Sequence, residues 1–211
     1  LMLIEAYRQL EQTSMVSALL PEFNKVARQV CEGQQLDMNF EKRPDVGLDE
    51  YLEMIKLKTS VLLASALKMG AILAEATDTQ QENVYSFGLN LGLAFQIQDD
   101  YLDSFGEQDN FGKQVGGDII QSKKMILYLL TLEHLNDDDQ KSFLELYASN
   151  LPDKVEMVKS FFKSSGAHHK TLELKQHYEQ LAKHALNRIN GHPDYMNNLN
   201  EIMGFLSTRA H

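Results

Sequence analysis

The strongest chemical signal in the sequence is a cluster of three aspartates, Asp99, Asp100 and Asp103, which ends an otherwise apolar segment. On an α-helix, Asp99 and Asp103 lie on one face, and Gln96 precedes them by one turn. Gln96 could orient a ligand there, or be a core amide with satisfied hydrogen bonds. Carboxylates held this close repel one another unless a cation binds between them. Because hard divalent cations prefer oxygen ligands, the cluster predicts a divalent metal site.

The alternative interpretation of this cluster is a solvated acidic helix end. Acidic side chains near a helix C-terminus oppose the helix macrodipole, so this placement is unfavourable without a compensating cation. A second acidic run, Asp137–Asp139, precedes an apolar segment and suits a helix start, where negative charge is favourable. We therefore predict a metal site at the first run and a helix cap at the second.

Lysines near the aspartates in the sequence could bind an anion beside such a metal. The glycines of segment 111–118 allow the backbone to approach a ligand closely, and Lys113 within it offers a charge suited to phosphate. Lys123 and Lys124 follow, although an ordinary exposed helix face explains them equally well. Lys58 precedes an apolar segment, where its charge needs a partner, an opening or a path to the surface. Together with the carboxylates, these lysines predict a diphosphate held through a metal.

Helical periodicity dominates the elements that must position these side chains. The sequence has few prolines and glycines and almost no strand-like alternation. We expect one all-α domain over residues 1–211. The predicted helices are 1–11, 21–32 with a stop at Gly33, 48–76, 79–103, 118–135, 139–148, 152–162, 168–190 and 195–207. Polar loops are predicted at 37–47 and 104–117.

Composition excludes several classes of protein. The net charge of −10 argues against nucleic acid and against an anionic membrane surface as main partners. The single cysteine, Cys31, excludes an internal disulfide framework and fits a reducing, cytoplasmic compartment. The most apolar window, 59–76, is interrupted by Lys68 and Glu75, so we interpret it as a buried core helix and expect no membrane span.

The segment 88–103 resembles the second aspartate-rich motif, FQxxDDxxD, of the trans-isoprenyl diphosphate synthases, or polyprenyl synthetases. Further matching residues fall in the family's order and at its usual spacings over about residues 1–135, whereas the remaining chain resembles the family only in being helical. These residues are Gly33-Gln34, Asp37, Tyr51, Lys58-Thr59, Gly70, Gly112-Lys113, Gly117-Asp118-Ile119 and Lys123.

The resemblance implies an isoprenoid-synthase helical bundle and an Mg²⁺-dependent reaction. An allylic diphosphate would ionise, isopentenyl diphosphate would attack the cation, and a proton would be lost. By the same resemblance, the Mg²⁺ ligands would be Asp99 and Asp103, with Asp100 supporting. The lysines that neutralise the diphosphate would be Lys58, Lys113 and Lys123.

The resemblance also assigns roles to neutral side chains and to a second helix. Thr59 and Gln96 would turn oxygen dipoles toward the developing cation, and with Lys58 and Lys113 they form the expected catalytic set. Gln34 and Asp37 would support the other metal site. By resemblance we also expect a homodimer.

One departure from the family pattern concerns its first aspartate-rich motif, which has no match before Asp37. Leu1 falls in what looks like mid-helix, so we expect an N-terminal part to be missing and these residues to be inactive alone. Two alternatives remain open: a non-catalytic subunit of a prenyl synthase, and a terpene cyclase on the same fold. A calcium-binding helical module is disfavoured, since no EF-hand loop is present.

Overall fold

The computed structural model describes residues 1–106 and 115–208, which contain helices and no strand. The predicted all-α fold class is therefore confirmed. The helices are α1 (Met2–Glu11), α2 (Val16–Phe40), α3 (Leu48–Ile55), the π-helix η1 (Lys56–Ser60), α4 (Val61–Leu73), α5 (Asp78–Phe105), α7 (Gly117–Ile120), α8 (Ile126–His134), α9 (Asp137–Ala148), α10 (Lys154–Ser164), α11 (Ala167–Leu186) and α12 (Pro193–Thr208). None of these helices is long and apolar enough to cross a membrane.

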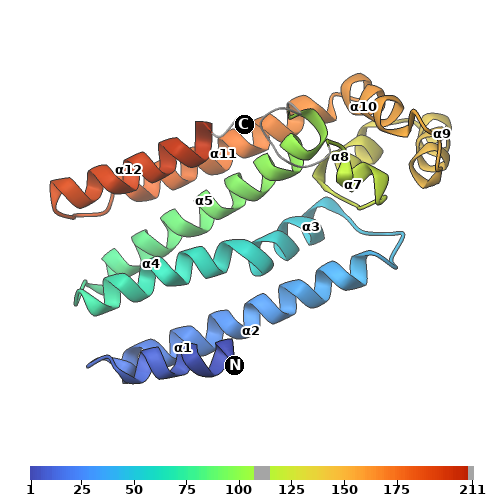
Figure 1. Ribbon diagram of the computed structural model, residues 1–211. Helices are drawn as coiled ribbons and strands as arrows, with labels where there is room; N and C mark the ends of the chain where they lie inside the picture. Colours follow the sequence, from blue (N-terminus) through green and yellow to red (C-terminus); the bar gives the residue numbers. More distant parts are fainter. Residues whose placement is uncertain (107–114, 209–211) are drawn as a thin grey trace.

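The long helices lie side by side in the order α2, then α3 to α4, then α5, then α11 (Figure 1). At one end, α1 packs against the start of α2, and α12 contacts α5. The shorter helices α7 to α10 gather at the other end, beside the end of α5 (Figure 1). The aspartates Asp99, Asp100 and Asp103 at the end of α5 therefore lie where the long helices meet the group of short ones.

The hydrophobic core is concentrated at the end of the molecule that carries the short helices. Each apolar side chain that is fully buried there contributes roughly 1.5–3 kcal/mol relative to an exposed one. The most completely buried large side chains of this cluster are Ile97, Ile119, Ile126, Leu127, Phe143, Val158 and Phe162. This core fixes the end of α5 against α7, α8 and α10.

Three predicted elements are wrong in detail. Helix α2 does not stop at Gly33 but continues to Phe40. The predicted helix 48–76 is interrupted by the five-residue π-helix η1. The predicted helix 118–135 is divided into α7 and α8 by a turn in which Ser122 has a φ of 54°. In each case contacts with distant residues override the local pattern.

Gly33 is a contact point rather than a helix end. A Cβ built on Gly33 would lie 2.7 Å from the backbone carbon of Leu57, and closer still to the backbone nitrogen of Lys58. On the opposite side, a Cβ on Gly92 of α5 would lie 2.8 Å from the Cα of Ser60. Two glycines from two helices thus allow the backbone of η1 to sit between them.

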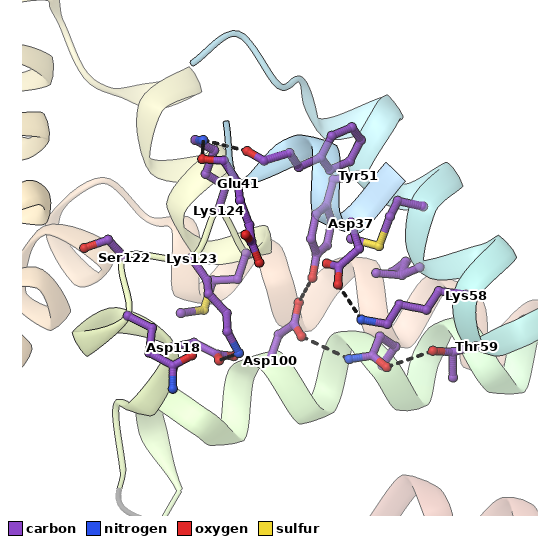
Figure 2. Close-up of a pocket in the computed structure, with 16 residues that line it drawn as sticks. Asp37, Glu41, Tyr51, Lys58, Thr59, Asp100, Asp118, Ser122, Lys123 and Lys124 are labelled. Atoms are coloured by element: carbon purple, nitrogen blue, oxygen red, sulfur yellow. Dashed lines mark hydrogen bonds and ion pairs between the residues drawn. The ribbon is translucent and has the colours of Figure 1, made fainter. Parts of the chain in front are cut away.

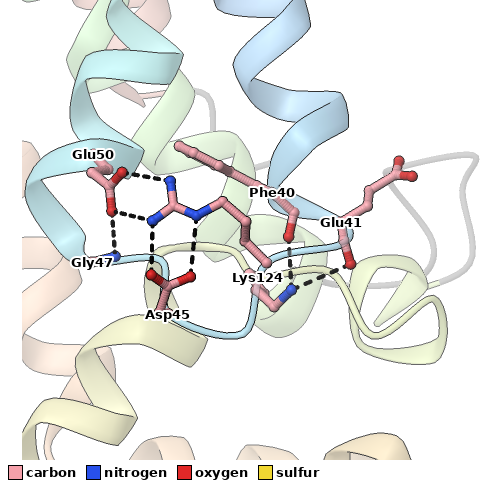
Figure 3. Close-up of polar contacts among 7 residues, drawn as sticks. Phe40, Glu41, Asp45, Gly47, Glu50 and Lys124 are labelled. Carbon is pink, nitrogen blue, oxygen red and sulfur yellow. Dashed lines mark hydrogen bonds and ion pairs between the residues drawn. The ribbon is translucent and has the colours of Figure 1, made fainter.

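The connection from α2 to α3 is held by charged side chains. The Arg43 guanidinium lies 3.1 Å from an Asp45 oxygen and 2.7 Å from a Glu50 oxygen, and Glu50 also accepts a hydrogen bond from the Gly47 backbone N–H. Hydrogen bonds from Arg43 lower the pKa of both carboxyls. Figure 3 shows this network beside Lys124, whose Nζ donates to the carbonyl oxygen of Phe40 at 2.7 Å. The end of α2 is therefore tied to the turn that precedes α8.

Candidate active site

A cavity of about 450 Å³ opens between α2, α3, η1, α5 and the turn after α7. Its wall combines charged and apolar side chains that come from segments far apart in the sequence (Figure 2). Its lining residues are Asp37, Phe40, Glu41, Tyr51, Met54, Ile55, Lys58, Thr59, Gln96, Asp100, Asp118, Gln121, Ser122, Lys123, Lys124 and Met125. Most of the polar residues predicted to carry chemistry therefore share one pocket.

Asp100 is the member of the aspartate cluster that lines this pocket. Its carboxylate is buried, with 5% of the residue exposed, and accepts hydrogen bonds from the Tyr51 hydroxyl and from Gln96 Nε2, the latter at 3.2 Å. Burial raises the pKa of Asp100 to about 7, and the neighbouring charges of Asp118 and Asp99 add to this rise. The hydrogen bonds from Tyr51 and Gln96 oppose it.

The π-helix η1 presents Lys58 and Thr59 to the pocket. Lys58 Nζ lies 2.6 Å from an Asp37 oxygen of α2, and both side chains are partly exposed. Thr59 Oγ1 donates to Gln96 Oε1 at 3.3 Å, so a chain of hydrogen bonds runs from Thr59 through Gln96 to Asp100 (Figure 2). A π-helix of this kind is rare and often occurs at functional sites, which fits the position of η1 in the wall of the cavity.

The opposite wall is formed by α7 and the turn that follows it. Lys123 Nζ forms an ion pair with Asp118 at 2.5 Å, and Asp118 is anchored because its backbone N–H donates to Asp103 Oδ2 at 3.0 Å. The ion pair raises the pKa of Lys123. Burial raises the pKa of Asp103, which the Asp118 N–H partly offsets. Asp103 therefore does not line the pocket itself but binds the backbone of Asp118, which does.

The other predicted site residues either do not line the cavity or lie outside the described part of the chain. Asp99 is half-buried on α5, and Gln34 is exposed on α2, and neither lines the cavity. Lys113 lies outside the described residues. Lys123 and Lys124, which fall within the predicted helix 118–135, belong instead to the turn between α7 and α8. The predicted roles of Asp99, Gln34 and Lys113 stay predictions.

Two residues of the pocket, Tyr51 and Asp118, were expected only as matching positions of the family pattern and were given no role. Tyr51 is buried and bonded to Asp100, which its position in the sequence does not indicate. Asp118 was expected only as part of a motif, yet it pairs with Lys123 and lines the cavity. Its partner is five residues away, across a turn that helical periodicity does not foresee.

The donor set fits a hard divalent cation. The aspartate oxygens at this end of α5 are held in a setting where burial and mutual repulsion disfavour their charge, as the raised pKa values of Asp100 and Asp103 show. Within the described residues, no three His, Cys, Asp or Glu side chains converge closely enough to hold a metal by themselves. Mg²⁺ commonly binds through one or two carboxylates together with water and substrate phosphates, which needs no such closed cage.

Lysines and aspartates around one cavity of an all-helical bundle form a setting suited to a phosphate group held with a metal ion. The family model described as polyprenyl synthetase matches residues 1–164. The chain therefore belongs to the polyprenyl synthetase family, and the resemblance drawn from its motifs is confirmed.

Similar proteins carry related names. The chain is 37% identical over 142 residues to a short chain isoprenyl diphosphate synthase of Methanocaldococcus jannaschii, covering 67% of this chain and 43% of that protein. It is 36% identical over 159 residues to a geranylgeranyl diphosphate synthase of Sulfolobus acidocaldarius, covering 75% and 48%. The chain thus spans less than half the length of these two relatives.

Solved structures agree with the fold. A crystal structure of a geranylgeranyl pyrophosphate synthase superposes with a TM-score of 0.91 at 43% identity, covering 100% of this chain and 67% of that one. A geranylgeranyl pyrophosphate synthetase from Pyrococcus horikoshii superposes with a TM-score of 0.90 at 27% identity, covering 97% and 63%. The arrangement of the helices is therefore that of this family.

Proposed function

We propose that the protein is a prenyltransferase that condenses isopentenyl diphosphate with an allylic diphosphate to a linear trans-prenyl diphosphate. The observation that carries this proposal is the meeting of Lys58, Lys123 and Asp100 around one cavity in a chain of the polyprenyl synthetase family. The named relatives are prenyl diphosphate synthases, which supports the substrate class.

The charged side chains would bind and ionise the allylic diphosphate. Lys58 and Lys123 exchange their carboxylate partners, Asp37 and Asp118, for diphosphate oxygens when substrate enters. Mg²⁺, held by Asp99, Asp100 and Asp103 together with the diphosphate, would supply Lewis-acid stabilisation of the leaving group. Lys113 would add a further positive charge.

The neutral side chains would protect the cation that forms. Thr59 and Gln96 are already linked by a hydrogen bond, so their oxygen dipoles are oriented before substrate arrives. Three apolar lining residues, Phe40, Met54 and Ile55, limit the access of water, which would otherwise quench the cation. Gln34 and Asp37 would help to support the other metal site in this scheme.

We further propose a cytoplasmic homodimer. The 211-residue chain by itself is expected to be inactive, because it spans less than half the length of the two synthases compared above. The test therefore uses the full-length protein, with the 211-residue segment assayed in parallel.

The experiment supplies isopentenyl diphosphate, an allylic diphosphate and Mg²⁺ to the full-length protein and identifies the products by chromatography. We expect a prenyl diphosphate lengthened by isoprene units. A hydrocarbon or alcohol formed from the allylic substrate alone would instead indicate a terpene cyclase. No turnover in a folded sample would contradict the proposal and favour a non-catalytic subunit.

A matched pair of variants tests the site. Asp103→Asn removes one carboxylate charge at the pocket, and Asp138→Asn makes the same change in the exposed acidic run at the start of α9. Loss of a group that stabilises developing charge costs about 10²–10³-fold in turnover. We expect that loss for Asp103→Asn and wild-type turnover for Asp138→Asn; equal activity of the two would remove Asp103 from the mechanism.

A further inference from the structure

A buried lysine lies behind the wall of the pocket. Lys154, at the start of α10, has only 4% of its surface exposed. Its Nζ donates to Ser122 Oγ at 2.8 Å and lies 5.3 Å from the centre of the Tyr147 ring. Neither Lys154 nor Tyr147 lines the cavity, whereas Ser122 does. The Lys154 ammonium is therefore separated from the pocket by one residue, Ser122, to whose hydroxyl it is hydrogen-bonded.

Ser122 occupies a backbone conformation that needs support. Its φ of 54° is in the left-handed region, which residues other than glycine rarely adopt. Its Oγ donates to the carbonyl oxygen of Tyr147 at 2.8 Å while accepting from Lys154, so both α9 and α10 hold it. The strained turn is thus kept by contacts from outside the pocket.

The same turn carries the pocket lysine Lys123. The Tyr147 hydroxyl donates to the carbonyl oxygen of Lys123 at 2.5 Å, and Lys124 fastens the other end of the turn to Phe40 of α2. Lys123 is left to face the cavity and Asp118 (Figure 2). The direction of the Lys123 side chain therefore depends on a turn whose backbone is fixed by Tyr147 and Lys154.

We propose that Lys154 is a positioning residue for anion binding: through Ser122 it holds the turn that presents Lys123 to a diphosphate and places a second positive charge behind it. The identity of the anion rests on the proposed function. The arrangement itself rests on the contacts among Lys154, Ser122 and Tyr147.

The cost of the Lys154 charge supports this role. Desolvation lowers the pKa of Lys154, and no carboxylate within the described residues offsets it. A buried ammonium without a carboxylate partner is weak evidence for a role in stability, because its loss of hydration offsets much of what its contacts contribute.

The test compares two lysines of α10 in the full-length protein. Lys154→Met removes the buried ammonium, and Lys159→Met removes one that pairs with Glu156 at 2.9 Å and lies over Phe105, away from the cavity. Binding of inorganic pyrophosphate in the presence of Mg²⁺ is measured by calorimetry, and the melting temperature by circular dichroism. We expect about a tenfold rise in Kd for Lys154→Met, because the turn that presents Lys123 loses its hold and the anion loses a nearby positive charge, with a change in melting temperature no larger than that of Lys159→Met. Lys159→Met should bind as the wild type does.

A second variant keeps the proposal testable if Lys154→Met does not fold. Ser122→Ala retains the lysine but removes the hydroxyl that links it to the turn, and we expect a several-fold rise in Kd. In the condensation assay, both variants should raise KM for the diphosphate substrate and leave kcat within about twofold. A loss confined to melting temperature would show a merely structural role and overturn the inference.

The remaining outcomes separate this inference from the proposed function. Wild-type affinity in Ser122→Ala, or equal weakening in Lys154→Met and Lys159→Met, overturns the inference alone. Pyrophosphate binding that depends on Lys154 without any condensation overturns the proposed function alone. Absence of pyrophosphate binding in the folded wild type overturns both.

Discussion

Replacing Gly33 by alanine is the sharpest way to ask whether the position of η1 matters. The added methyl group would lie 2.7 Å from the Leu57 backbone carbon and 2.8 Å from the Lys58 Cα. Ordinary contacts between carbon atoms are at about 3.5–4.0 Å, so α2 and η1 must separate by roughly 1 Å. The obstacle is backbone, so no side-chain rotation can relieve it.

The expected cost has two parts. Overpacking of this kind destabilises by about 1–3 kcal/mol, from which the better helix propensity of alanine recovers roughly 0.5–1 kcal/mol. In a protein of this size, each 1 kcal/mol lowers the melting temperature by about 2–4 °C. Because Lys58 and Thr59 move with η1, a displacement near 1 Å should also lower turnover by about 10²-fold.

The assay measures melting temperature, kcat and KM of the full-length protein for Gly33→Ala and two controls. Gly88→Ala places a methyl group 2.8 Å from the Ala64 Cα, a milder clash of the same kind, against the backbone of α4 and away from η1. Gly70→Ala has nothing within 4 Å and should be slightly more stable than the wild type. We expect both Gly33→Ala and Gly88→Ala to lose stability, and only Gly33→Ala to lose most of its turnover. Equal turnover in those two variants would refute the role given to η1.

Two further predictions concern stability. Ser60 is fully buried and its Oγ has no hydrogen-bond partner among the described residues, so Ser60→Ala should raise the free energy of unfolding by about 1 kcal/mol. This would appear as a higher urea midpoint at unchanged slope, and a lower midpoint would contradict it. Asn136 caps α9, since its side-chain oxygen accepts from the backbone N–H groups of Asp138 and Asp139 at 3.1 and 3.0 Å. Asn136→Ala should cost about 1 kcal/mol of unfolding free energy without altering turnover, and an unchanged melting temperature would argue against the cap.

The sequence predicts local features of this protein well, because local rules decide them. The predicted helix 79–103 begins within one residue of α5, although its cap is Thr77, whose side chain accepts from the Gln80 backbone N–H. The acidic run Asp137–Asp139 forms the first turn of α9, where negative charge is favourable as expected, although the cap itself is Asn136. In both cases the deciding interactions span only a few residues.

The pocket-facing side of α5 depends on other helices and could not be predicted in this way. Periodicity places Asp99 and Asp103 on one face, yet of the three aspartates in this cluster it is Asp100 that lines the cavity. What selects it is Tyr51, forty-nine residues earlier, whose hydroxyl donates to the Asp100 carboxylate. Helical spacing gives the faces of a helix but not which face meets its neighbour.

Gly33 shows the same limit from the opposite side. A glycine followed by a polar turn is the usual signal for a helix stop. Its function here is a close contact with Lys58, twenty-five residues later, and the ion pair of Lys58 with Asp37 follows from that contact. Had α2 ended at Gly33, Asp37 would have been in a loop, and Lys58 would have faced the cavity without its helical partner. The misassigned helix end and the position of the pocket lysine therefore have the same cause: α2 must continue past Gly33 for η1 to be held in place.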